Sequence, residues 1–237
     1  TIDGGTTALI LAASSVGGNL TLLDGNASGI TDTGTITVGG NLSATTDAGS
    51  GVITLDTLAV TGTIALATNS GGAATVVNAS GLNLATSTLT GTFSGTATIG
   101  DITDSGTLTI TGAAIFKTRV DGSNIVLDSS SNAFSAAVTM IADAGGEDFG
   151  NITFVDSAGV DLDTSASADG DLFINAGTDG AVGGNLSITA TTGNITQVVA
   201  LAVTGTTTLV TSADNATIAL GTTTNAFTGA LTITTND

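Results

Sequence analysis

The pentapeptide VGGNL occurs three times in this chain of 237 residues, at Val16–Leu20, Val38–Leu42 and Val182–Leu186. The sequence offset between the first two copies is 22, and that between the second and the third is 144. Internal periods of about 20–50 residues are typical of solenoids, in which each repeat is one coil that stacks on the next. We therefore interpret VGGNL as one corner of a coil that recurs on different turns.

Two longer internal matches support a small repeating unit. Gly100–Met140 aligns with Gly193–Ile233 without a gap at an offset of 93. The segment 38–63 aligns with 182–206 at an offset of 144, which falls to 143 after one gap. A single large domain repeat cannot produce both offsets, whereas 22, 93 and 144 are close to one, four and six times one small unit. The sequence predicts coils of about 22–24 residues.

The local pattern is that of β-strands throughout. Segments such as TLTITG, NLSITA, ATIAL and ALTIT alternate apolar and polar residues with period two, and they are rich in Thr, Val and Ile. Gly, Asn and Asp interrupt these segments every few residues, as tight turns require. No stretch carries the periodicity of a helix, so the sequence predicts an all-β fold.

Two all-β architectures fit this pattern: a parallel β-solenoid (β-helix) with about three short strands per coil, and tandem β-sandwich domains. Sandwiches commonly contain Pro and a large buried aromatic residue, but this chain has seven Phe and no Pro, Trp or Tyr. A narrow solenoid interior suits Val, Ile, Leu and Ala. We therefore favour a single continuous β-solenoid segment over residues 1–237, cut from a longer repetitive chain.

Stacked coils place equivalent residues above one another, which predicts side-chain ladders. Phe134 and Phe227, both in the tripeptide NAF, are predicted to fill equivalent interior positions. Asparagines recur at the strand entries and are predicted to form amide ladders that satisfy backbone groups at the turns. These asparagines are Asn19, Asn41, Asn185 and Asn194.

The charge of the chain excludes several classes of partner. It has 20 acidic residues and two basic ones, Lys117 and Arg119, which gives a net charge of −18. Binding to nucleic acids needs Lys and Arg to displace counterions, so no nucleic-acid partner is expected. Anionic lipid is disfavoured for the same reason. No segment approaches the ~18 apolar residues of a membrane span, so no membrane insertion is expected.

The repeat style resembles that of a known class of bacterial protein. GNIT…LAVTG, VGGNLS, GTLTITG and NAF…ALTI look like the repeat region of large filamentous-haemagglutinin-like adhesins and autotransporter-type passengers. This resemblance implies a right-handed parallel β-helix, secretion across an outer membrane, and an extracellular location at the bacterial cell surface. It also implies a role as a stalk or an adhesive fibre, and it supplies no catalytic residues.

The residue types argue against an enzyme. There is no His or Cys and there is one Glu, so the usual proton-transfer groups are scarce. Calcium is the one cofactor considered, because hard cations prefer clusters of carboxylate oxygens. The glycine-rich nonapeptide of calcium-binding β-rolls is absent, and the alternative is that these aspartates are solvated turn residues. The candidate ligands are Asp156, Asp161, Asp163, Asp169 and Asp171.

The sequence leaves two principal hypotheses for function. The first is a non-catalytic stalk or fibre segment of a secreted surface adhesin, which would contact a host or a neighbouring cell through regions outside this chain. The second is a self-assembling subunit of an extracellular filament or sheath, in which copies of the chain join end to end. A calcium-binding or ice-binding solenoid module is a minor alternative.

Overall fold

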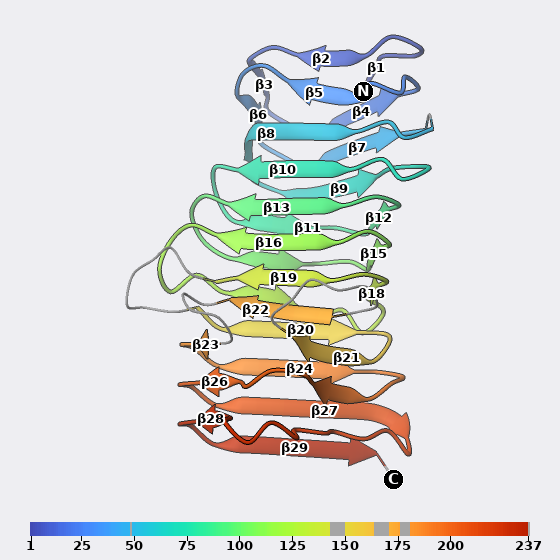
Figure 1. The fold of residues 1–237 in the computed structure, drawn as a ribbon. Helices are drawn as coiled ribbons and strands as arrows, with labels where there is room; N and C mark the ends of the chain where they lie inside the picture. Colours follow the sequence, from blue (N-terminus) through green and yellow to red (C-terminus); the bar gives the residue numbers. More distant parts are fainter. Residues whose placement is uncertain (48, 143–149, 164–170, 176–180, 237) are drawn as a thin grey trace.

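The computed structural model describes residues 1–47, 49–142, 150–163, 171–175 and 181–236; for Asp163, 171–175 and Ala181 it describes the backbone alone. Within these residues every regular element is a β-strand, and every strand pairing is parallel. The strands stack in about nine turns of a β-solenoid, with the two chain ends at opposite ends of the stack (Figure 1). The predicted all-β solenoid is confirmed, and tandem sandwiches are excluded.

One sheet, here called sheet A, runs along the whole stack. Its main path has eleven strands in chain order, and three short strands branch from β9 beside it. The path comprises β1 (Ile2–Asp3), β4 (Leu20–Asp24), β7 (Leu42–Thr46), β9 (Thr63–Ala67), β11 (Leu82–Leu84), β14 (Ile102–Asp104), β17 (Ile125–Leu127), β20 (Ile152–Asp156), β24 (Leu186–Ala190), β27 (Thr207–Asp214) and β29 (Leu231–Asn236). The branch comprises β12 (Ser87–Leu89), β15 (Leu108–Ile110) and β18 (Ala133–Phe134).

Sheets B and C complete the walls of the solenoid. Sheet B comprises β2 (Leu9–Leu11), β3 (Ser14–Val16), β5 (Ile30–Asp32), β6 (Ile36–Val38), β8 (Ile53–Val60), β10 (Ala74–Asn78), β13 (Phe93–Ala97), β16 (Ala114–Thr118), β19 (Val138–Ile141), β21 (Val160–Asp163), β22 (Asp171–Asn175) and β25 (Ile195–Gln197). Sheet C comprises β23 (Ala181–Val182), β26 (Ala202–Val203) and β28 (Ala226–Phe227).

The three VGGNL segments occupy the corner that leads into sheet A. Val16 pairs with Val38 in the neighbouring coil, and Leu20 pairs with Leu42. The third copy joins Val182 of β23 to Leu186 at the start of β24. Because β7 and β24 are six steps apart along sheet A, the second and third copies are separated by six turns, as predicted.

The other long internal match, Gly100–Met140 with Gly193–Ile233, relates opposite walls of the solenoid. Its first segment begins with β14 in sheet A, whereas its second begins with β25 in sheet B. The Thr-Gly corner is used on both sides: Thr111-Gly112 leads into β16 of sheet B, and Thr204-Gly205 leads into β27 of sheet A. The interpretation of this match as four whole coils was therefore wrong.

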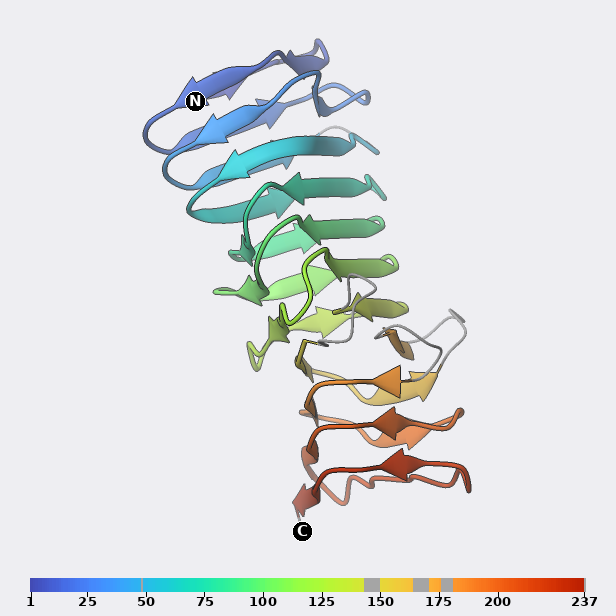
Figure 2. The same cartoon turned by 90° about the vertical axis from the view of Figure 1, so that its left-hand side faces the viewer.

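Coil length also varies more than predicted. Leu20 pairs with Leu42 at a sequence offset of 22, but Ile125 pairs with Ile152 at an offset of 27, and Ile152 pairs with Leu186 at an offset of 34. In the longest coil the order of strands in sheet B differs from their order in the chain. β22 follows β21 in the sequence but lies between β19 and β21 in the sheet. Both views show the upper and lower coils stacked above and below this interruption (Figures 1 and 2).

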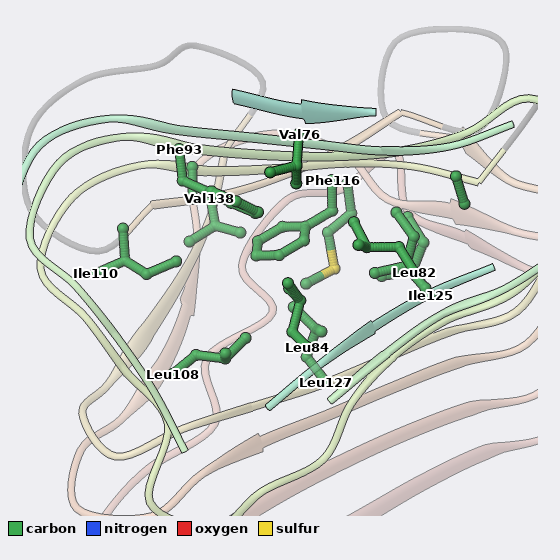
Figure 3. Close-up of a cluster of buried hydrophobic side chains, with 14 of the residues drawn as sticks. Val76, Leu82, Leu84, Phe93, Leu108, Ile110, Phe116, Ile125, Leu127 and Val138 are labelled. Atoms are coloured by element: carbon green, nitrogen blue, oxygen red, sulfur yellow. The ribbon is translucent and has the colours of Figure 1, made fainter. Parts of the chain in front are cut away.

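The interior is a column of stacked apolar side chains. Strands such as β4, β7 and β24 alternate buried and part-buried residues, so every second side chain points inward. Leu84 and Leu127 of sheet A face Phe116 and Val138 of sheet B across this interior (Figure 3). Each such burial stabilises the fold by about 1.5–3 kcal/mol.

Candidate functional site

A polar ladder lies at the entry of the sheet A strands. Asn19 Oδ1 accepts a hydrogen bond from the backbone N–H of Asn41 one coil on, at 2.9 Å. Asn41 Oδ1 accepts the N–H of Thr63 in the same way, at 3.0 Å. Each amide oxygen therefore adds a side-chain hydrogen bond between two coils, beside the backbone hydrogen bonds that link them at the same corner.

A longer ladder of the same kind runs through the lower coils. Asp101 Oδ1 accepts the N–H of Asn124 at 2.7 Å, and Asn124 Oδ1 accepts the N–H of Asn151 at 2.8 Å. Asn151 Oδ1 accepts the N–H of Asn185, and Asn185 Oδ1 accepts the N–H of Thr206, each at 2.8 Å. Four side chains thus link five successive coils.

Sequence reasoning named Asn185 but missed the rest of this ladder. The signal was present, because Gly100-Asp101-Ile102-Thr103 and Gly150-Asn151-Ile152-Thr153 repeat one tetrapeptide with Asp and Asn exchanged. Asn194, in a third copy, accepts the N–H of Thr217 at 2.8 Å, but it precedes β25 and so lies on sheet B.

Asn185→Ala should lower the free energy of unfolding by about 1–2 kcal/mol, because the Thr206 N–H and hydroxyl lose their shared acceptor. Asn185→Asp is the matched control, since Asp101 shows that a carboxylate oxygen can fill this role. Urea unfolding of the two variants checks this. Equal losses in both would contradict the ladder.

A second set of side-chain hydrogen bonds is made by the asparagines of the two NAF tripeptides. Asn132 is fully buried; its Oδ1 accepts the N–H of Leu108 at 2.8 Å, and its Nδ2 donates to Asp104 at 2.7 Å. Asn225 repeats this arrangement with the N–H of Leu201 at 2.9 Å and with Gln197 as the partner side chain. The repeated NAF drew attention to the phenylalanine, whereas the asparagine carries the recurring hydrogen bonds.

The two NAF phenylalanines lie on different walls. Phe134 in β18 is buried and stacks between Phe116, at 6.1 Å, and Phe154, at 5.1 Å between ring centroids. Phe227 in β28 belongs to sheet C and is half-buried. Both phenylalanines hold the same place in the matched segments. They lie apart in space because these two segments follow opposite walls of the solenoid, as described above.

The predicted calcium ligands do not form one cluster of described side chains. Asp156 lies inside β20, Asp161 in β21 is the register partner of Asp171 in β22, and Asp163 ends β21. Asp169 lies outside the described residues. Among the side chains that the structure describes, no group of three or more His, Cys, Asp or Glu could hold a metal ion. Calcium binding by this segment stays a prediction.

Asp156 is a carboxylate inside the solenoid, with 1 % of its surface exposed. Burial raises its pKa above the ordinary value of 3.8, and backbone N–H donors, that of Phe134 first, oppose this rise. A raised carboxyl pKa in the folded state means that the folded chain binds the proton more tightly than the unfolded chain. The contribution of Asp156 to folding stability is therefore greatest below its pKa in the unfolded chain, and it is lost as the pH rises through its pKa in the folded chain.

Asp156→Asn should be more stable than the wild type at pH 7, and this advantage should vanish as the pH falls below about 4. The asparagine keeps an acceptor for the Phe134 N–H but carries no charge. Thermal unfolding of both proteins across this pH range measures the difference. An advantage that does not change with pH would contradict a buried charge as its cause.

The described outer surface carries both basic residues of the chain and several hollows. Lys117 and Arg119, the two cations, are exposed on and just after β16. One hollow of about 540 Å³ is lined by Phe134, Asp161 and Asn194 among others. No helix long and apolar enough to cross a membrane occurs in the part of the chain that the structure describes.

Comparison with known proteins gives one finding. A family model described as repeats of unknown function (DUF5649) matches residues 71–141 and 149–234. A search of the curated proteins found no match, and neither did a search of the solved structures. The two matched segments together span more than half of the chain. The chain belongs to the DUF5649 family of repeats.

Proposed function

We propose that this chain is a structural segment of a stalk or fibre in a secreted bacterial surface adhesin. The observation that carries the proposal is the unbroken path of sheet A, which runs through eleven strands from β1 to β29. Hydrogen bonds between coils and the asparagine ladders both act along this axis. A fold of this kind resists bending and separates what lies at its two ends.

The surface chemistry supports a structural role over a catalytic one. The net charge of −18 keeps separate rods apart in solution and provides no basic patch for nucleic acid. The buried polar side chains described above serve the coils themselves, as caps and ladders. The function proposed needs no cofactor, and the stalk would act through regions outside this chain at an extracellular location.

A second candidate is a self-assembling filament subunit. Neighbouring strands of sheet A pair in parallel along the whole stack, so another copy of the chain can extend the sheet in the same way. β29 pairs with β27 on one side. Its other edge could pair with a further coil of the same polypeptide or with another copy of the chain.

Protease treatment of intact cells that express the native protein tests both candidates. An antibody against this segment should lose its epitope when protease is added outside, and the epitope should sit in a polypeptide far larger than 22.6 kDa. An accessible epitope in chains of about this size that join without covalent bonds would favour the filament. An epitope protected until the cells are lysed would contradict both.

A further inference from the structure

A hollow of about 460 Å³ lies at the corner that leads into sheet A, and it spans three successive coils. Its lining includes Gly62 just before β9, Asn83 of β11, and Asp101 just before β14. The first polar ladder ends at the N–H of Thr63, and the longer one begins at Asp101. The hollow therefore occupies the gap between the two ladders.

The coil in this gap has no side chain at the ladder position. Leu82 pairs with Ile102 in the next coil, so Gly81 stands beside Asp101. Asn83 lies between two buried leucines, so its side chain points outward from the sheet, and it is the register partner of Thr103. Since Thr103 is two residues after Asp101, the side chains of Asn83 and Asp101 share one face of the strands.

Asp101 is the one acidic residue of the two ladders, and the ladder itself does not require its charge. Asp101 Oδ1 accepts the N–H of Asn124 at 2.7 Å and lies 3.3 Å from Asn124 Nδ2. Asn151 and Asn185 fill the same role with a neutral amide oxygen. Asp101 is exposed, and its other carboxylate oxygen accepts no hydrogen bond from the described residues. This oxygen is therefore available to a ligand.

Asn83 supplies a second acceptor that lacks a donor. Its Oδ1 is buried and receives no hydrogen bond from any described residue. A buried carbonyl oxygen is normally paired, because an unpaired one costs stability. Asn83 is half-buried in the wall of the hollow, so rotation of its amide can present this oxygen to a ligand. Neither Lys117 nor Arg119 lines the hollow.

We propose that this hollow binds the guanidinium group of an arginine side chain from a partner protein. A guanidinium group is planar, carries N–H donors on three nitrogens and has no acceptor, so it can donate to Asp101 Oδ2 and to Asn83 Oδ1 together. The net charge of −18 concentrates cationic partners near the surface. This contact lies on the wall of the solenoid and does not depend on the proposed role as a stalk.

NMR titration of the ¹⁵N-labelled chain with N-acetylarginine amide tests the site. The signals of the Asn83 side-chain amide and of the Asp101 backbone should shift, and the dissociation constant follows from the titration curve. N-acetylcitrulline amide has nearly the same shape without the charge and should bind at least about 10-fold more weakly. N-acetyllysine amide should also bind more weakly, because an ammonium group lacks the planar fork.

Two variants and a control locate the binding. Asp101→Asn and Asn83→Ala should each weaken binding of N-acetylarginine amide at least about 10-fold. Asp101→Asn keeps an oxygen for the Asn124 N–H, as Asn151 does for Asn185, so its melting temperature should stay close to that of the wild type. Asp121→Asn, in an exposed turn outside the hollow, is the matched control and should bind like the wild type.

Equal binding of the arginine and citrulline compounds, or of the arginine and lysine compounds, would overturn the proposal. Unchanged affinity in Asp101→Asn would do the same, and if that variant does not fold, unchanged affinity in Asn83→Ala decides against the site. Shifts at Asp121 as large as those at Asn83 would also overturn it, since the arginine compound would then act on any exposed carboxylate.

Discussion

Gly29→Ala should destabilise the solenoid by about 4 kcal/mol or more, among the largest effects that a single substitution produces. A Cβ atom on Gly29 would lie 1.9 Å from the carbonyl oxygen of Val52 in the next coil. That oxygen cannot move away freely, because it accepts the N–H of Ile30 at 2.9 Å. Gly29 also has a φ of 72°, which a residue with a side chain adopts at a cost. Urea unfolding measures the loss.

Gly71→Ala separates these two causes. Gly71 has a φ of 85°, but a Cβ atom there would meet no atom within 4 Å. Its alanine variant should therefore lose only about 1 kcal/mol, the cost of backbone strain alone. If Gly29→Ala and Gly71→Ala lose similar amounts, the coils are not packed as closely as the Gly29–Val52 contact requires.

Phe116→Ala should lower the free energy of unfolding by about 3–5 kcal/mol. Phe116 is fully buried, and its ring centroid lies 5.2 Å from that of Phe93 and 6.1 Å from that of Phe134. These rings, with Phe154, form a continuous aromatic row through four coils of the interior. Alanine would leave a gap in this row that the neighbouring coils, held by their hydrogen bonds, cannot close.

Ile115→Ala is the matched control on the same strand. Ile115 points outward from β16 and is 42 % exposed. Its loss should change the stability by less than about 1 kcal/mol. A large loss for Ile115→Ala together with a small one for Phe116→Ala would mean that β16 faces the other way, and the register of sheet B would be wrong.

The repeated corner and the strand alternation were sufficient to predict the fold. VGGNL predicts stacked coils because it recurs at an offset typical of one coil, and Leu20 does pair with Leu42. The match between Gly100–Met140 and Gly193–Ile233 could not be interpreted correctly from sequence, since Thr-Gly turns look alike on both walls. The position of β22 between β19 and β21 could not be predicted either, because no local sequence pattern specifies which strand another strand pairs with.

The polar side chains that are buried or form ladders were predicted less completely than the strands. Asparagines were identified by repetition, so Asp101 was missed, although its carboxylate starts the longer ladder. Asp24 was not singled out, because a turn aspartate looks the same in sequence whether its side chain is exposed or buried. Only the register of β4 and β7, which turns residue 24 inward beside Thr46, reveals its burial.

Distances between spin labels test the central claim, that this chain is one continuous stack, most directly. The chain has no cysteine, so labelled pairs can be introduced at outward positions without background. Labels at Ser43 and Thr153, Ser43 and Ser187, and Ser43 and Thr232 lie five, six and eight strands apart along sheet A. At ~4.8 Å per strand, a continuous stack predicts separations of about 24, 29 and 38 Å that rise in this order. Separations that do not increase with the number of strands between the labels would contradict it.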